Sequence, residues 1–501
     1  MTDPDGAGPD DQAAPSTGSG RQRRVGAHPE HRRWTAMISV VAVVAAVAVI
    51  SSALPAPTAA PAPAGADGVP VPPANARASS AVCVGGTGTA AATTIYLTNT
   101  TPRTVAGMMT SIGQPVSTGP APTVQRSVDV PALDTVAVDP TSGLGQASNA
   151  SSFVFAGGGV VASQVVGGPG GWSTAPCASQ AGPQWSFAGG STTGANTLTL
   201  ALSDPTATEA VVDISFLTAT GVITPQAYQG LVVPAGQLAV ENVGQFVQNA
   251  SDIATFVTAE SGALVGAEFQ QWSSGSGSGV SLRLGAPALS TTWRFAQTTS
   301  GGPGSAVDFD LANPGRSPAT ATVSFSLSSG TVVPQRVSVP ASSIVDFSAS
   351  ATPGLPQQVP YSVTIDSSAP IVAGRSVEAA TGSPAPVWGS SSGTVTAARR
   401  WVVPGPGIAS QPGTAGATVE SLAVVNPSGS AARVTVTSLP GDRPVAMFAV
   451  APDGVAVLGA KLVGGLSVFS ITSSQPVTVE EDSQPSGAPG VVSSTGFPFA
   501  D

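Results

Sequence analysis

Histidine is almost absent from this chain of 501 residues, and its placement excludes several kinds of catalyst. Both histidines, His28 and His31, precede an apolar segment at residues 34–54, so no residue beyond that segment carries an imidazole. Ser-His-Asp triads, Cys-His dyads and histidine-ligated metal centres are therefore excluded from the remainder of the chain. We expect a protein without enzymatic activity, without a cofactor and without a bound metal.

Charge is scarce as well, since charged residues make up 9% of the chain and lysine occurs once, as Lys461. Residues 1–33 hold five arginines and five acids, whereas residues 55–501 hold 13 basic and 23 acidic residues. The net charge of -10 therefore belongs to the long C-terminal part. An acidic surface without basic clusters repels phosphate backbones, so nucleic acid is excluded as a partner.

Cysteine occurs only twice, as Cys83 and Cys177. In an oxidising compartment these residues would form a disulfide that closes a loop of about 95 residues and contributes up to about 4 kcal/mol in the chain-entropy model. Two unrelated buried thiols are the alternative. Metal binding by two cysteines without a nearby histidine is disfavoured.

The one long apolar run, residues 34–54, contains no charge and is long enough to cross a hydrocarbon core of about 30 Å as a helix. Five arginines precede it, and basic flanks stay in the cytoplasm. We therefore predict a disordered cytoplasmic tail at 1–33, a single transmembrane helix at 34–54 that anchors the chain in the cell membrane, a stiff Pro/Ala-rich spacer at 55–79 and extracytoplasmic residues thereafter. A cleaved signal peptide followed by secretion is the alternative.

Internal repetition is the strongest feature of the remaining sequence. Trp185, Trp293 and Trp401 are separated by an identical step of 108 residues, and each opens a similar block. Within each block an apolar strand ends in an Asp-Pro or Asn-Pro pair, and a Val-Pro-Ala element follows. This periodicity predicts tandem modules instead of one large fold. The predicted modules, of which the first is the most diverged, are residues 80–178, 179–285, 286–395 and 396–501.

Each module shows a pattern of about seven short strands with a turn signal every eight to twelve residues. Gly and Pro are abundant, with 59 and 46 residues. The pattern predicts an all-β protein of four immunoglobulin-like β-sandwiches. A β-propeller is the alternative, and it is less favoured because it predicts self-similarity at half the observed step.

The tryptophans are the first candidate functional residues. Trp172, Trp272 and Trp388 lie near module ends, and each is followed closely by Trp185, Trp293 or Trp401 of the next module. One interpretation is that the six rings pack across the junctions between modules. The other is that Trp272 and Trp388, beside Gly/Ser-rich loops, stack on sugar rings or on a partner surface.

Two acidic groups leave paired-carboxylate hydrolysis formally open. Asp308 and Asp310 would share one face of a strand, which favours a solvated edge or a weak Ca²⁺ site over a tuned acid and base. Glu480, Glu481 and Asp482 are expected to follow the last strand of their module, where a charge run normally protects a sheet edge. Neither group predicts catalysis.

This layout, with an Arg-rich tail, one membrane segment, a Pro/Ala spacer and recurring Asn-Pro and Val-Pro-Ala elements, resembles a family of uncharacterised actinobacterial envelope proteins. The resemblance implies location and class, and it carries over no catalytic residues. We predict a non-enzymatic, membrane-anchored protein that presents its modules to envelope polysaccharide or to an envelope protein. The alternatives are a carboxylate-dependent glycan hydrolase and an accessory subunit of an envelope glycosyl-transfer system.

Overall fold

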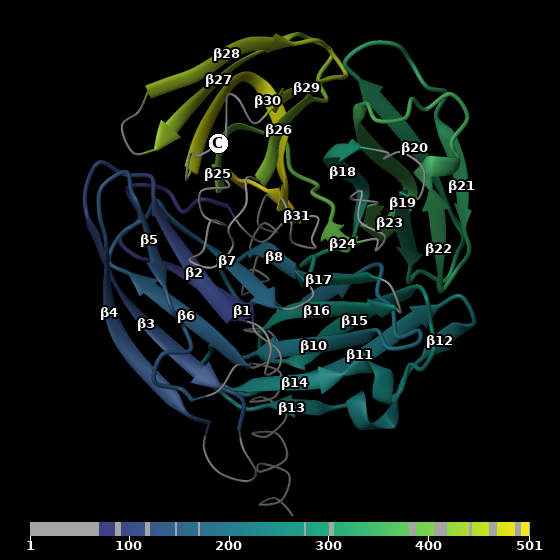
Figure 1. Cartoon of the computed structure of the whole chain (residues 1–501). Helices are drawn as coiled ribbons and strands as arrows, with labels where there is room; N and C mark the ends of the chain where they lie inside the picture. The colour runs from purple at the N-terminus through teal and green to yellow at the C-terminus, as the bar shows by residue number, and fades with distance from the viewer. Residues whose placement is uncertain are drawn as a thin grey trace, which may run out of the picture. The chain divides into compact units, whose positions relative to one another are not determined.

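The computed structural model (Figure 1) describes residues 70–85, 92–115, 121–145, 148–168, 171–274, 277–299, 305–379, 387–404, 418–439, 443–459, 468–485 and 492–499. The predicted cytoplasmic tail, the apolar segment and most of the predicted spacer lie outside these ranges. All described residues belong to one compact unit. None of its helices is long and apolar enough to cross a membrane.

The predicted all-β class is confirmed. The described residues form strands, turns and three single-turn 3-10 helices, and they contain no α-helix. In the text below, repeats 1 to 4 denote residues 80–178, 179–285, 286–395 and 396–501.

Repeat 1 supplies two antiparallel sheets that share one hydrophobic core. Its strands are β1 (Ser79–Gly85), β2 (Ala92–Asn99), β3 (Val105–Gly113), β4 (Thr123–Val130), β5 (Thr135–Val138), β6 (Asn149–Phe155), β7 (Val160–Gly168) and β8 (Gly171–Pro176). One sheet has the order β1-β6-β3-β4 and the other the order β5-β2-β7-β8. Phe153 from the first sheet and Leu97 from the second lie in the same buried cluster.

Repeat 2 follows the same scheme, with one strand split in two. Its elements are β9 (Gln184–Phe187), β10 (Thr197–Ser203), β11 (Ala210–Thr218), β12 (Gly221–Ile223), η1 (Gln226–Tyr228), β13 (Leu231–Val233), β14 (Leu238–Asn242), η2 (Val243–Gln245), β15 (Ile253–Ser261), β16 (Val265–Ser274) and β17 (Gly277–Leu284). In one sheet the strand order is β12-β11-β15-β9, and β13 also pairs with β11. The other sheet contains the consecutive strands β14-β10-β16-β17.

In repeats 3 and 4, one long strand takes part in both sets of paired strands that are separate sheets in repeat 1. Repeat 3 contains β18 (Ser290–Thr299), β19 (Ala306–Asn313), β20 (Ala319–Leu327), β21 (Gln335–Val339), β22 (Ser343–Ser348), η3 (Ala349–Ala351), β23 (Pro360–Ala379) and β24 (Val387–Ser392). Repeat 4 contains β25 (Ala398–Pro404), β26 (Thr418–Asn426), β27 (Ala432–Leu439), β28 (Arg443–Val450), β29 (Gly454–Gly459), β30 (Val468–Pro485), β31 (Val492–Thr495) and β32 (Phe497–Pro498). The first half of β23 pairs with β18 and β20, and its second half pairs with β19 and β24. The strand β30 divides in the same way.

The opening tryptophans anchor this scheme from inside the core. The side chains of Trp185, Trp293 and Trp401 are at most 1% exposed. Each indole N–H donates to a backbone carbonyl of the same repeat, at 2.7 Å for Leu264, 3.0 Å for Ile371 and 2.9 Å for Val477. The shared 108-residue step therefore marks an equivalent core position, in which a large apolar ring is buried with its one polar atom satisfied.

The recurring asparagine before the hairpin turn has an equally local cause. Asn99, Asn313 and Asn426 each donate from Nδ2 to three backbone carbonyls, at 2.7 to 3.2 Å. One buried amide thus satisfies three acceptors of the turn, including the carbonyls of the Val-Pro or Val-Ala pair that follows the fourth strand. Repeat 2 has Asp204 at this place, and a carboxylate oxygen of that residue has no hydrogen-bond partner.

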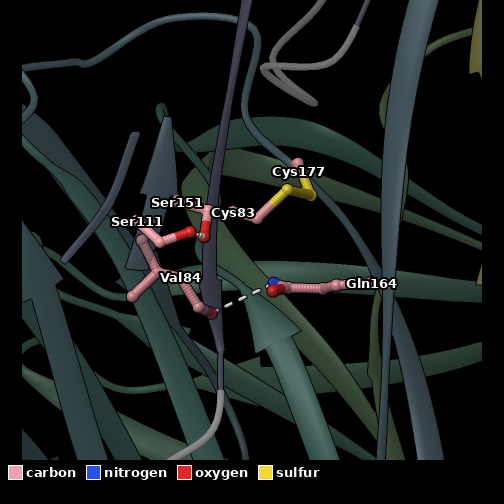
Figure 2. The surroundings of a disulfide bond; sticks show 6 residues. All are labelled: Cys83, Val84, Ser111, Ser151, Gln164 and Cys177. Carbon is pink, nitrogen blue, oxygen red and sulfur yellow. Dashed lines mark hydrogen bonds between the residues drawn. A yellow bond between two sulfur atoms is a disulfide. The ribbon is translucent and has the colours of Figure 1, made fainter. Parts of the chain in front are cut away.

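The predicted disulfide between Cys83 and Cys177 is confirmed, with a Cα–Cα distance of 4.5 Å. Figure 2 shows it beside Val84, whose carbonyl accepts a 3.0 Å hydrogen bond from Gln164 Nε2. The cysteines lie in β1 and just after β8. The bond therefore joins the first strand of repeat 1 to the chain leaving its last strand.

Four strands, one from near the end of each repeat, contact one another in cyclic order. The strand β8 contacts β17, β17 pairs in parallel with β24, β24 contacts β31, and β31 contacts β8. Figure 1 shows their labels close together. The junctions between repeats are thus formed by backbone strands as well as by side chains.

Candidate functional site

Ten side chains of repeats 2 and 3 line a pocket of about 250 Å³, which we call the Trp-Asp pocket. Repeat 2 contributes Ser191, Asn196, Ser251, Asp252 and Trp272. Repeat 3 contributes Asp308, Asp310, Asp346, Ser376 and Trp388. The pocket therefore brings together Trp272, Trp388, Asp308 and Asp310, four of the residues that the sequence singles out.

The register of three strands places the repeat 3 side chains on one face. In the pairing of β19 with β22, Asp310 lies opposite Asp346, and in the pairing of β19 with β23, Asp308 lies opposite Ser376. Opposed residues of antiparallel strands share a face, as do residues i and i+2 of one strand. Three carboxylates and one hydroxyl therefore converge, although like charges directly opposite each other are unfavourable.

The two tryptophans lie in a row with a glycine between them. Trp272 on β16 lies opposite Gly279 on β17, and Gly279 lies beside Trp388 on β24. At about 4.8 Å between strands, the two tryptophan Cα atoms are about 10 Å apart. A Cβ atom at Gly279 would lie 2.2 Å from the backbone oxygen of Trp388. Glycine thus permits the close strand approach and leaves no side chain between two partly exposed rings.

Asp310 is the buried end of the pocket, with 3% of its surface exposed. Ser376 Oγ donates to its Oδ2 at 3.2 Å. A Cβ atom at Gly189 would lie 2.2 Å from Oδ2, so the glycine, whose φ is +84°, leaves the space that this carboxylate occupies. Burial, and then the charges of Asp252 and Asp346, raise the pKa of Asp310 from 3.8 to about 8, against the opposing effects of Arg283 and Ser376.

The other carboxylates titrate under the same influences. Although Asp346 keeps contact with water, desolvation by the surrounding protein, followed by Asp308 and Asp252, raises its pKa to about 7. Partial burial also raises the pKa of Asp308, with a further contribution from Asp252 and an opposing hydrogen bond from Ser348. The charge of Asp252 thus contributes to the raised pKa of Asp308, Asp310 and Asp346.

The repeat 2 wall is fixed by a short hydrogen-bond network. Asn196 Nδ2 donates to Ser191 Oγ at 3.1 Å, and its Oδ1 accepts from the backbone N–H of Ser273 at 3.0 Å. Gln270 Nε2 donates to the Ser191 carbonyl at 3.0 Å, and Ser251 Oγ donates to Asp252 Oδ2 at 2.6 Å. These polar groups are therefore held in place before any ligand arrives.

The arrangement can accept hydrogen bonds and positive charge next to two aromatic faces. No basic residue lines the pocket, and Arg283 behind it is already paired with Glu268 at 2.7 Å. A phosphate or carboxylate ligand would meet only repulsion here. Among the described residues, no group of three or more His, Cys, Asp or Glu side chains is arranged to hold a metal ion.

Two sequence-based expectations about the acidic groups are wrong. Asp310 lies in a buried strand, not on a solvated edge, because repeat 2 covers its face of the sheet. Glu480 and Glu481 lie within β30 and are buried, at 2% and 5% exposure, instead of following the last strand. Glu480 forms a 2.5 Å ion pair with Arg375, so it joins repeat 4 to repeat 3.

The remaining predicted residues do not reach the pocket. Trp172 on β8 is 6% exposed and packs in the hydrophobic core, as do the three opening tryptophans. Asp252, Asp346 and Ser376 complete the pocket, and the sequence gives no signal for them. They come from separate strands and turns that only the packing of repeats 2 and 3 brings together.

A sequence profile described as a family of unknown function, DUF5719, matches residues 155–447. The chain belongs to the DUF5719 family. The matched region includes every residue that lines the Trp-Asp pocket, so the site lies within the part that is typical of DUF5719. No curated protein matches the chain.

Two solved structures are similar to parts of this DUF5719 chain. One is described as Thermotoga maritima 1070, with 17% identity over 21% of this chain and 93% of its own, and a TM-score of 0.20. The other is a tetra-tandem repeat from the extending region of a large adhesion protein, with 15% identity over 80% of this chain and 93% of its own, and a TM-score of 0.11.

Proposed function

We propose that this chain is a non-enzymatic, membrane-anchored protein of the bacterial cell envelope that holds an envelope polysaccharide in the Trp-Asp pocket. The row formed by Trp272, Gly279 and Trp388 beside fixed carboxylates and hydroxyls is the observation that carries the proposal. Aromatic faces provide apolar area for the C–H face of a sugar ring. The polar groups beside them accept and donate hydrogen bonds to its hydroxyls.

The proposed setting is the outer face of a membrane, with four tandem immunoglobulin-like sandwiches following a transmembrane helix at 34–54. The recurrence of one strand order in four repeats and the core shared by both sheets of repeat 1 support the modular assignment. The disulfide between Cys83 and Cys177 supports an oxidising compartment. The arginine-rich flank and the uncharged run support the orientation.

Binding of defined envelope oligosaccharides to the purified full chain tests this function. Trp272→Ala and Trp388→Ala should each reduce affinity at least tenfold, because each removes one stacking face. Trp272→Phe should retain most of the affinity. Unchanged binding in both alanine variants, with circular dichroism that confirms their folding, would refute the assignment of the site.

The same incubation separates binding from hydrolysis. A carboxylate-dependent hydrolase would release new reducing ends, and the release would stop in Asp310→Asn. Retention of the glycan without new ends is the expected result. An accessory role in envelope glycosyl transfer would instead be indicated by co-purification of a membrane transferase that depends on residues 34–54.

A further inference from the structure

The charge of the Trp-Asp pocket is its most selective property. Its lining contains four carboxylates and no basic side chain. The nearest compensating cation, Arg283, is engaged by Glu268 and by the backbone carbonyl of Ala188. No basic side chain of the lining therefore compensates these carboxyl groups once they ionise, and the raised pKa values of Asp310 and Asp346 reflect this.

Asp310 supplies hydrogen-bond acceptors at the buried end of the pocket. The residue is almost fully buried, and Ser376 Oγ donates to its Oδ2. Because Asp310 also lines the pocket, its carboxyl group can accept a further hydrogen bond from a ligand there.

Resting on the proposed function, we infer that the Trp-Asp pocket recognises an amino sugar, a hexosamine unit that carries a free ammonium group. An ammonium donates three hydrogen bonds and carries the charge that the carboxylates lack. The faces of Trp272 and Trp388 attract a cation and also stack on the sugar ring. An N-acetylated unit lacks the charge, and an acidic sugar is repelled.

The volume limits the occupant to a small unit. At about 250 Å³ the pocket lies just below the range of about 300 to 1,000 Å³ that is typical of small-molecule sites. This space suits one sugar ring with its substituents. Neighbouring units of a polysaccharide would then extend outward past Asp346, which faces water.

Two oligosaccharides with one backbone test the inference. The full chain is titrated with tetramers of β-1,4-linked glucosamine and of β-1,4-linked N-acetylglucosamine at about pH 7.5, above the pKa of about 7 of Asp346 and below the pKa of about 7.7 to 8.0 that is usual for α-amino groups. The glucosamine tetramer should bind at least tenfold more tightly. Its affinity should also fall with added salt, since charge attraction is screened.

Pocket variants show whether the carboxylates cause the preference. Asp310→Asn and Asp346→Asn should each weaken binding of the glucosamine tetramer several-fold more than binding of the N-acetylated tetramer, because only the first carries the charge that these carboxylates attract. Asp129→Asn, which removes an exposed carboxylate of repeat 1, is the matched control and should change neither affinity. Because Asp346 lies at the water-facing end, its variant keeps the test valid even if the buried variant is misfolded.

The outcomes are distinct. Equal affinity for the two tetramers, a preference for the N-acetylated one, or a preference that survives both pocket variants would overturn the amino-sugar inference and leave glycan binding intact. If neither tetramer binds, and other envelope glycans also fail, the proposed function itself is wrong.

Discussion

Replacing Asp310 with asparagine should stabilise this protein, and the gain should grow with pH. Asparagine has nearly the same shape, and its side-chain oxygen can still accept from Ser376. It cannot ionise, so the variant avoids a buried negative charge next to Asp252 and Asp346. At low pH the wild-type carboxyl is neutral as well, and the two proteins should then differ little.

The magnitude follows from the pKa of Asp310, which is 3.8 in the unfolded chain and about 8 in the fold. Between these values the folded state binds a proton that the unfolded state does not, so stability is full below pH 3.8 and falls until about pH 8. One pKa unit corresponds to 1.36 kcal/mol, which gives an upper limit of about 6 kcal/mol for a group that titrates alone. Because the neighbouring aspartates share the effect, we expect about 2 to 4 kcal/mol at pH 8.5.

Urea unfolding of the full chain, followed by tryptophan fluorescence at pH 4, 6 and 8.5, measures this difference. The exposed Asp129→Asn variant is the control and should follow the wild type at every pH. A stability difference between Asp310→Asn and the wild type that does not change with pH, or a wild type that is more stable at pH 8.5, would refute the reasoning about burial and charge.

Three other predictions concern the repeats. Asp204→Asn should raise the thermal unfolding midpoint by the equivalent of about 1 to 3 kcal/mol, because the new amide can donate where the other repeats place their asparagine and removes an acceptor without a partner; a lower midpoint would contradict the proposed turn chemistry. Reduction of the disulfide, or Cys83→Ser, should lower the free energy of unfolding by up to about 4 kcal/mol in calorimetry, and hydrogen exchange should locate the loss in repeat 1. Unchanged hydrogen-exchange protection of β1 would contradict this prediction. Arg375→Met and Glu480→Gln should each lower the free energy of unfolding by about 3 to 5 kcal/mol, and a double-mutant cycle should give a coupling energy above about 1 kcal/mol. Additive losses would mean that the ion pair does not join repeats 3 and 4.

Much of the local architecture could be read from the sequence because its causes are local. The step between Trp185 and Trp293 predicts equivalent core positions, and the Asn313-Pro314 pair marks the end of β19 in the structure. The alternation of apolar residues in β10 predicts a strand, although residues 200–203 are buried on both faces because the other repeats cover them. The two cysteines predicted their own disulfide, since only one pairing was available.

Only the tertiary structure decided what covers each face of a strand. Period-two spacing places Asp308 and Asp310 on one side of β19, yet it does not say whether that side meets water or repeat 2. The same holds for Glu480, whose partner Arg375 lies 105 residues away in sequence. The sequence by itself predicted the strands and the repeated blocks, because their causes are local. The Trp-Asp pocket required the packing of two repeats, because its charge, burial and aromatic walls come from side chains that no local pattern links.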